Sequence, residues 1–199
     1  MQDQDSSIEQ LKTFLSGFPE LSKEAVNKLT EMIPVVSFKK GSIILEEGDV
    51  PQECYHVLKG LVREFRTIDG DEKTTEFYDE SKATISSSNY SNQTPSEFSL
   101  ECMEDCLLIA GNMEIDEAHY KEFPELIEIT RNMLESDLNN AKSMHSKFIL
   151  SSPKERYLHL METRPGLLNR VPLYQIASYL GMTAESLSRI RKRLLAEKE

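Results

Sequence analysis

The sequence has few cysteines and no long apolar run. Its three cysteines, Cys54, Cys102 and Cys106, are an odd number and too few for a disulfide-stapled scaffold. No apolar stretch approaches the roughly 18–20 residues that a membrane helix needs. The N-terminal segment is polar and acidic, without the basic start and apolar run of a secretory signal. We therefore expect a soluble protein in the reducing cytoplasm, with no membrane among its partners.

Motifs for catalysis and for cofactor binding are also lacking. The chain has no paired nucleophile and base, no HExxH, no phosphate-binding loop and no paired-carboxylate motif. An iron–sulfur cluster needs about four cysteine ligands. Cys54 and His56 are expected on the same face of one strand, but two ligands without partners make no metal or haem site. Cys102 and Cys106 are interpreted as small packing residues. The sequence therefore predicts neither an enzyme nor a cofactor or metal.

The charge is unevenly divided along the chain. Residues 152–199 hold nine Lys/Arg and five Asp/Glu, a net charge of +4. The remaining 14 basic and 29 acidic residues give residues 1–151 a net charge of −15, and the two values sum to −11. The overall acidity argues against a protein whose whole surface binds polyanions, whereas the C-terminal quarter is suited to phosphates.

Residues 171–195 have the pattern of a helix-turn-helix. Pro172 suits the first turn of a helix. Gly181 falls where a helix end often needs a positive φ, and Thr183 can cap a second helix through its hydroxyl. The apolar positions at helical spacing are Leu173, Ile176, Ala177 and Leu180 in the first helix, and Leu187, Ile190 and Leu194 in the second. The other face of the second helix carries Glu185, Ser188, Arg189, Lys192 and Arg193. The alternative is an ordinary helical hairpin with a solvated basic face.

The N-terminal part predicts two short helices followed by many short strands. Residues 6–33 have apolar positions at helical spacing, broken at residues 17–19, with Ser22 as a possible cap. From Pro34 the apolar period changes to two. We expect strands near residues 36–38, 43–45, 55–57, 61–65, 75–77 and 106–110. Asp69-Gly70 is a strong hairpin signal, and the polar residues 81–99 predict a loop. Short strands with regularly spaced turns indicate a sandwich or barrel.

A long helix is predicted at about residues 124–150, or roughly 40 Å at 1.5 Å per residue. Ile127, Leu134, Ala141 and Phe148 recur every seven residues, with Leu138 among the apolar residues between them. Such a stripe suits a helix packed against its symmetry mate, and the alternative is a helix packed on its own barrel. The predicted dimer interface consists of Ile127, Leu134, Leu138 and Phe148. A further helix is expected to begin at Pro153.

The order of these parts resembles the Crp/Fnr family of bacterial transcription regulators over nearly the whole chain. The segments that carry the resemblance are KKGSIILEEGD, YHVLKGLVREF, SPKERYLHLMETRP and, most specifically, IASYLGMTAESLSRIRKRL. The resemblance implies an α+β fold with an N-terminal β-roll (jelly-roll) sensor domain of the cyclic-nucleotide-binding type, a long dimerisation helix and a C-terminal winged helix-turn-helix. It assigns residues 1–123 to the roll, 124–150 to the dimerisation helix and 151–199 to the DNA-binding domain.

The resemblance also implies which residues contact DNA. Glu185 and Arg189 match two positions that members of the family commonly use on base edges, and Ser188 lies on the same face. Because Glu185 and Arg189 are four residues apart, both can enter one major groove. The position before Glu185, often Arg in cyclic-AMP-responsive relatives, is Ala184, so we expect a different sequence preference. The predicted contacts to the DNA backbone are Thr183, Lys192 and Arg193. The implied partners are double-stranded DNA, a second copy of the chain and RNA polymerase.

The ligand pocket departs from the family pattern. Nucleotide-binding members hold the ribose and cyclic phosphate with a Gly-Glu turn and, further along, an Arg-Ala pair. Residues 83–100 contain neither Arg nor Gly, and Ser86 and Ser96 stand where Glu and Arg would be. A buried phosphate needs a cation or several N–H donors. We therefore expect no binding of cyclic AMP, and Ser86, Ser88 and Ser96 become candidate residues of a pocket for another effector.

Three functions follow from these patterns. The leading one is a homodimeric DNA-binding regulator with the barrel as its sensor. The alternative is a small-molecule or cyclic-nucleotide-binding sensor module that does not read DNA, and the basic face of the second helix weighs against it. The third is an enzyme that uses the barrel cavity, which the lack of catalytic motifs disfavours.

Overall fold

The computed structural model describes residues 2–80, 84–85 and 88–197, which form two compact units. The first, here the roll unit, comprises Met1–Glu64 and Phe77–Leu138. The second, the helical unit, comprises Phe65–Glu76 and Asn139–Glu199. The division passes through one long helix and two strands. The predicted domain boundaries at residues 124 and 151 follow secondary structure instead, and they stay a prediction.

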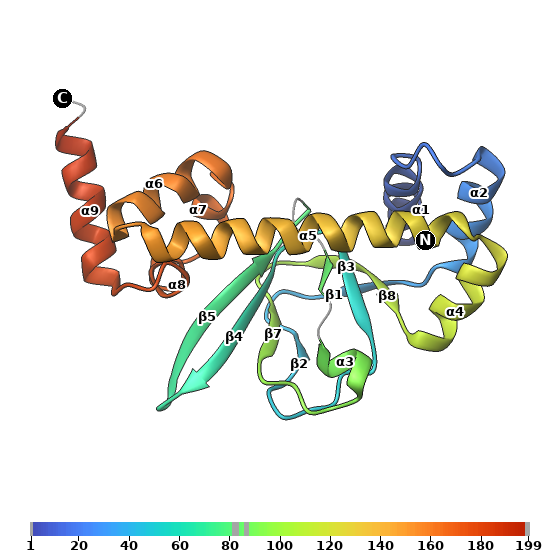
Figure 1. Ribbon diagram of the computed structural model, residues 1–199, viewed down its shortest axis with the longest axis horizontal. Coiled ribbons are helices and arrows are strands. Elements are labelled where there is room, and N and C mark those ends of the chain that lie inside the picture. The colour runs from blue at the N-terminus through green and yellow to red at the C-terminus, as the bar shows by residue number, and fades with distance from the viewer. Residues whose placement is uncertain (1, 81–83, 86–87, 198–199) are drawn as a thin grey trace. The chain divides into compact units, whose positions relative to one another are not determined.

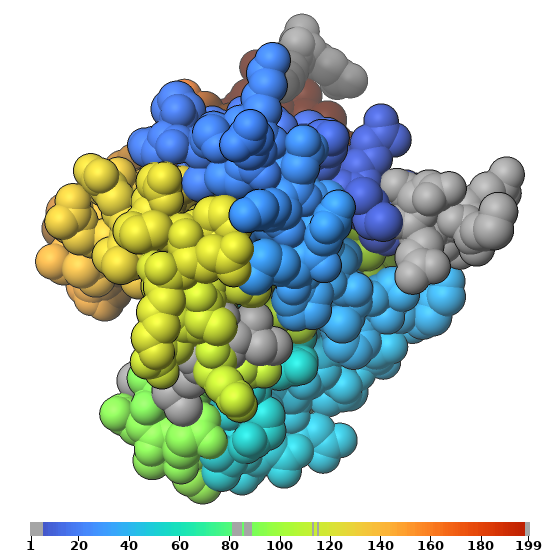
Figure 2. Space-filling view, turned by 90° about the vertical axis from the view of Figure 1, so that its right-hand side faces the viewer, coloured from blue at the N-terminus to red at the C-terminus, as the bar shows by residue number. Residues whose placement is uncertain are grey.

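The chain begins with the two predicted helices, α1 (Gln2–Leu15) and α2 (Lys23–Met32). The hydroxyl of Ser22 accepts a hydrogen bond of 3.1 Å from the backbone N–H of Ala25, so Ser22 caps α2 as predicted. Both helices bury apolar side chains against the start of a later helix, α5. This cluster consists of Leu11, Leu15, Leu21, Ala25, Val26, Leu29, Phe123 and Ile129. Figure 2 shows the blue N-terminal segment packed beside the yellow segment to which Phe123 and Ile129 belong.

Among the residues that the structure describes, eight short strands form the predicted roll. They are β1 (Val35–Phe38), β2 (Ile43–Leu45), β3 (Cys54–Lys59), β4 (Val62–Ile68), β5 (Asp71–Tyr78), β6 (Thr84–Ile85), β7 (Ser99–Cys102) and β8 (Cys106–Gly111). One sheet has the order β1-β8-β3-β6 and the other β2-β7-β4-β5. The pairs β1/β8, β3/β8, β3/β6 and β2/β7 are antiparallel. Their inward residues form a core of Val57, Val62, Ile85, Leu100, Cys102, Cys106 and Leu108.

Two glycines are required by the backbone of the roll. Asp69 and Gly70 have φ values of 54° and 83°, as the predicted two-residue hairpin between β4 and β5 needs. Gly60 has a φ of 110°, and an added Cβ would lie 2.7 Å from Sγ of Cys106. A side chain at this position is therefore excluded both by conformation and by the close approach of β8.

The segment 81–99 differs from the predicted loop. Its described residues include strand β6 and a short helix, α3 (Ser88–Asn92), and β7 begins at Ser99. The amide of Asn89 donates hydrogen bonds to Oγ1 of Thr94 (3.1 Å) and to the carbonyl oxygen of Pro95 (2.8 Å). Helix α3 is thus stabilised by local side-chain bonds rather than by an apolar period, and a periodicity search does not detect it.

Two helices follow the roll. Helix α4 (Met113–Glu122) was not predicted, whereas α5 (Glu125–Leu150) confirms the long helix. Helix α5 runs for 26 residues and buries Ile129 in the cluster with α1 and α2.

The helical unit contains α6 (Pro153–Thr163), α7 (Leu167–Arg170), α8 (Leu173–Tyr179) and α9 (Ala184–Ala196) (Figure 1). Ser152 and Glu155 form a reciprocal capping box at the start of α6. The fold class is that of a roll, a long helix and a helix-turn-helix, with one difference. Described residues 151–197 hold helices and no strand, so the implied wing is not part of them. Helix α7 stands between α6 and α8.

Candidate DNA interface and effector pocket

Helices α8 and α9 form the predicted helix-turn-helix. Gly181 has a φ of 65°, and the N–H of Met182 donates to the carbonyl oxygen of Ala177 at 3.0 Å, which closes the end of α8. Oγ1 of Thr183 accepts from the N–H of Ser186 at 3.2 Å and so caps α9. Leu187, on the apolar side of α9, is completely buried. Each local feature predicted for the motif is therefore in place.

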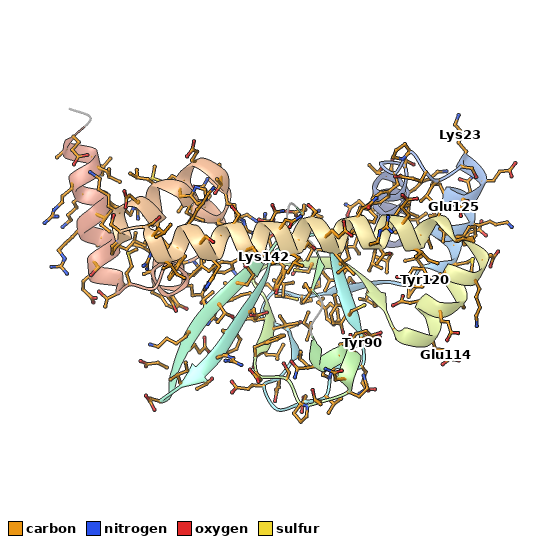
Figure 3. All side chains as sticks on the ribbon, in the orientation of Figure 1. Lys23, Tyr90, Glu114, Tyr120, Glu125 and Lys142 are labelled. Atoms are coloured by element: carbon orange, nitrogen blue, oxygen red, sulfur yellow. The ribbon has the colours of Figure 1, made fainter. Side chains whose placement is uncertain are left out.

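The polar face of α9 is open to solvent. Thr183, Glu185, Arg189, Lys192 and Arg193 are all exposed, and Ser188 is half-buried. Since one turn of helix separates Glu185 from Arg189, the structure brings these two predicted reading residues to one face. In Figure 3, nitrogen-tipped side chains gather on the side of α9 that faces away from α6.

Glu185 is held in its ionised form. Its own backbone N–H, then the hydroxyl of Thr183 and finally the positive charge of Arg189 lower the pKa of its carboxyl group. Glu185 also lies in the first turn of α9, where the helix dipole favours a negative charge. The face therefore offers one fixed acceptor and one guanidinium donor a turn apart.

Arg156 of α6 binds the backbone at the turn of the motif. Its Nη1 donates to the carbonyl oxygen of Leu180 at 3.1 Å, and its guanidinium lies 3.7 Å above the ring of Phe148. A Cβ added to Gly181 would come within 3.0 Å of the Phe148 ring. Part of the apolar surface of Phe148 is therefore used inside the helical unit, although we predicted it at a dimer interface.

The other three predicted interface residues lie uncovered on α5. Ile127, Leu134 and Leu138 are 56%, 48% and 54% exposed. They line an open groove of about 550 Å³ together with Tyr120, Thr130, Arg131 and Glu135. Figure 3 shows Tyr120 on α4 beside the first part of α5. Such a row of large exposed apolar side chains is unusual for a surface that faces only water.

The roll contains a cavity of about 230 Å³ between β2, β3 and α3. Its walls include the aromatic rings of Tyr55, Tyr90 and Phe98, and the carboxylates of Asp49 and Glu53 lie at its lining. No lysine or arginine is among the described residues that line it. Sequence reasoning missed this lining because its aromatic residues come from a strand, a helix and a loop that are far apart in the sequence, and Asp49 was interpreted only as a turn residue.

None of the three serines predicted for the pocket is among the described residues that line this cavity. Ser96 is buried, but its hydroxyl donates to the carbonyl oxygen of Phe98 (2.8 Å) and accepts from the N–H of Phe98 (3.2 Å). Its backbone N–H donates to the carbonyl oxygen of Asp49. Ser96 thus fastens a loop and is not among the lining residues. Ser86 lies outside the described residues, and Ser88 is described only by its place in α3.

Cys54 and His56 lie on β3 near the contact with α1 and α4. Burial, and then the charge of Asp116, raise the pKa of the Cys54 thiol to about 11, so it stays protonated at neutral pH and is a poor metal ligand. Burial lowers the pKa of His56 to about 4, and its ring lies 4.5 Å from that of Phe14. Within the described part of the chain, no group of three or more His, Cys, Asp or Glu residues could hold a metal ion.

Cys102 and Cys106 are free and buried in the core of the roll, in agreement with their interpretation as packing residues. Sγ of Cys106 lies 3.5 Å from the carbonyl oxygen of Leu61. In the described residues, no helix has both the length and the apolar character to span a bilayer.

Comparison with known families and structures agrees with the fold. Residues 35–114 match the family described as the cyclic nucleotide-binding domain, and the match spans the described strands from β1 to β8. No curated protein sequence matches the chain.

Several solved structures share the architecture. FixK2 from Bradyrhizobium japonicum has a TM-score of 0.67 at 19% identity and covers 83% of this chain and 86% of its own. The c-di-GMP responsive global regulator CLP from Xanthomonas campestris has a TM-score of 0.66 at 16% identity, with coverages of 89% and 93%. The catabolite activator protein of Thermus thermophilus has a TM-score of 0.54 at 22% identity, with coverages of 91% and 87%.

The class of the chain is therefore a cyclic-nucleotide-binding-type roll joined to a helix-turn-helix. The fold implied by the resemblance to the Crp/Fnr regulators is confirmed, and residues 35–114 match the cyclic nucleotide-binding domain.

The buried imidazole of His56 predicts a loss of stability in mild acid. The pKa of His56 is 6.5 in an unfolded chain and about 4 in the fold, so between these values the unfolded chain binds more protons. The free energy of unfolding should then fall as pH decreases from about 6.5 to about 4, by an amount on the order of 3 kcal/mol. Urea unfolding measured across this range would record the loss.

The variant His56→Phe is the matched control, because it keeps an aromatic ring against Phe14 and removes the titration. Burial raises the pKa of Asp116, which gives the opposite trend at low pH, but this contribution is common to both proteins. The difference between the two pH profiles therefore isolates His56. Identical pH profiles for the wild type and His56→Phe would contradict the lowered pKa of His56.

Proposed function

We propose that the chain is a homodimeric, sequence-specific transcription regulator that reads double-stranded DNA with helix α9. The observation that carries the proposal is the division of α9 into two sides. Leu187 is buried on one side, while Glu185 and Arg189 stand exposed on the other, one turn apart. A helix-turn-helix presents its second helix to the major groove in this way.

The side chains on α9 have the chemistry that DNA recognition needs. An arginine can donate two hydrogen bonds to one guanine, and a carboxylate can accept from the amino group of cytosine. Lys192 and Arg193 lie beside this pair and are exposed, as phosphate contacts require. The net charge of +4 over residues 152–199 favours the approach to DNA, while the acidic remainder of the chain opposes non-specific adhesion.

Dimerisation is proposed through α5. The exposed Ile127, Leu134 and Leu138 would be buried against the same residues of a second copy, which suits a two-fold axis along the helix. Two reading helices related by that axis would meet successive major grooves about 34 Å apart, on a near-palindromic site. RNA polymerase is a further partner if the regulator activates transcription. A protein that reads DNA acts where DNA is, so the predicted cytoplasmic setting is part of the proposal.

The roll is proposed to act as a sensor that does not respond to cyclic AMP, and not as an enzyme. A cyclic phosphate placed in the cavity would meet the carboxylates of Asp49 and Glu53 and no cation from the described lining residues. Moving an anion out of water requires a charge-assisted partner. The cavity is suited instead to a ligand that is uncharged or positively charged.

Selection of binding sites from a randomised DNA library, followed by fluorescence anisotropy on the selected site, tests the central claim. The proposal expects a palindromic consensus and specific binding far tighter than binding to random DNA. A sensor module that does not read DNA would give no consensus, and an enzyme would be revealed by turnover.

The first prediction of the proposed function separates base reading from phosphate contact. Arg189→Ala should cost about 1–3 kcal/mol on the selected site and relax the preference at one base pair, because a bidentate contact is lost. Lys192→Ala or Arg193→Ala should weaken binding equally on all sequences and reduce the dependence of affinity on salt. Anisotropy titrations at several salt concentrations distinguish the two.

Arg191→Ala is the matched control for Arg189→Ala. Arg191 has the same charge and is also exposed on α9, but it points away from the predicted reading face. It should leave sequence preference unchanged. An equal loss on selected and random DNA for Arg189→Ala would show that the reading face is assigned wrongly.

The second prediction concerns the dimer. Leu134→Lys should dissociate it, because an unpaired ammonium group would be buried at the centre of the interface. Ser136→Lys adds the same charge two residues away on α5, outside the apolar row, and should leave the dimer intact. Sedimentation of both variants measures whether each is a monomer or a dimer. An unchanged dimer for Leu134→Lys would place the interface elsewhere.

The third prediction is that cyclic AMP and cyclic GMP do not bind at physiological concentrations. Isothermal titration should give no binding heat for either nucleotide, for the electrostatic reason given above. A micromolar dissociation constant for either nucleotide would refute it, since backbone N–H groups would then supply what we assign only to a cation.

A further inference from the structure

The tip of the β4–β5 hairpin packs with the helical unit. Residues Phe65–Glu76 group with Asn139–Glu199, although the same strands continue into the roll unit at Glu64 and Phe77. Hydrogen bonds join the tip to the helices. The backbone N–H of Thr74 donates to Oγ of Ser178 at 3.0 Å. Oε1 of Glu76 accepts from the hydroxyl of Tyr179 at 3.2 Å and from Nη1 of Arg164 at 3.3 Å.

The carboxylate of Glu76 is the centre of this contact and is largely buried. The side chain of Glu76 is 16% exposed and that of Arg164 is 10% exposed. A charge removed from water in this way depends on its partners, because removal of either member of the pair weakens the compensation of the other. The hydroxyl of Tyr179 stays protonated as a donor, since burial and then the negative charge of Glu76 raise its pKa. The three groups therefore form one interdependent unit, here called the Glu76 clamp.

The clamp holds the helix-turn-helix at the point that sets the direction of α9. Ser178 and Tyr179 end α8, and Arg164 is the C-cap of α6. The turn through Gly181 follows directly, and α9 begins at Ala184. Arg156 of α6 also donates to the carbonyl oxygen of Leu180. The end of α8 is thus held by charged side chains from both the hairpin and α6.

The clamp leaves the reading face open. Glu185, Arg189, Lys192 and Arg193 are exposed in the structure that also contains these hairpin contacts. The hairpin is therefore compatible with DNA binding and does not cover the DNA-reading surface. Its contacts instead restrict how α8, and with it α9, can tilt.

We propose that Glu76 is a positioning residue for DNA recognition, which acts through Tyr179 and Arg164 to fix the orientation of the reading helix. This inference rests on the proposed function. Base readout needs the helix held within a narrow range of angles, whereas phosphate contact tolerates a looser fit.

The specificity ratio is the affinity for the selected site divided by the affinity for random DNA. The experiment compares this ratio between the wild type and the variants Glu76→Gln and Tyr179→Phe. Each variant should lower this ratio about tenfold, with binding to random DNA unchanged. The double variant should lose no more than Glu76→Gln alone, since both changes break the same unit. Tyr179→Phe removes one hydroxyl and keeps the ring, so it remains informative if Glu76→Gln folds poorly.

Asp71→Asn is the matched control, because it makes the same acid-to-amide change on the same strand at a side chain that is 76% exposed and pairs only with exposed Lys73. It should leave the ratio unchanged. Amide hydrogen exchange at residues 178–183 provides a second readout, and it should be faster in Glu76→Gln than in Asp71→Asn.

The outcomes separate the two proposals. If the wild-type protein selects no DNA sequence, the proposed function fails and the positioning role fails with it. If the wild type selects a sequence and the Glu76 and Tyr179 variants have the same specificity ratio as the wild type, only the positioning role of Glu76 is overturned. A loss in the ratio matched by Asp71→Asn would also overturn it.

Discussion

Helix α5 has apolar residues on two sides, and a single chain covers only one of them. Ile129 is buried with the N-terminal helices, and Leu126 and Met133 pack against the same cluster. Ile127, Leu134 and Leu138 stay in water. Burial of each such side chain stabilises by roughly 1.5–3 kcal/mol, so the uncovered side favours association with a matching surface. The proposed dimer, the two-fold arrangement of reading helices and the near-palindromic site all depend on this one imbalance.

The surface of α9 and the cavity of the roll carry side chains of opposite charge. The exposed arginines and lysine of α9 face outward, whereas the cavity of the roll is lined by Asp49 and Glu53. Within the helical unit, the charges that are not exposed serve a different purpose. Arg156 and Arg164 are partly buried, and both bind groups next to the turn of the helix-turn-helix. Charge at the surface is thus available to DNA, and charge beneath it fixes geometry.

The parts of the fold that were predictable from the sequence are those specified by local chemistry. The Asp69-Gly70 hairpin, the Ser22 and Thr183 caps and the positive φ of Gly181 all involve residues a few positions apart. The Glu76 clamp was not predictable, because its hydrogen bonds join residues 88 and 103 positions apart. The same reason hid the cavity, whose lining comes from β2, β3, α3 and the loops between them. Ser96 was placed in the pocket by its position in the sequence, but its hydroxyl is used by the backbone of Phe98.

The match to the cyclic nucleotide-binding domain and the proposed indifference to cyclic AMP are compatible, because different residues decide the two properties. The roll is specified by its turns and its packing. Gly41, Gly48 and Gly60 have φ values of 83°, 97° and 110°, and buried Arg63 pairs with Glu101 at 2.9 Å. None of these interactions requires a ligand. Phosphate binding depends instead on cations or N–H donors aimed into the cavity, and the lining described here presents carboxylates and aromatic rings. A roll can therefore keep its architecture while its cavity changes to another ligand chemistry.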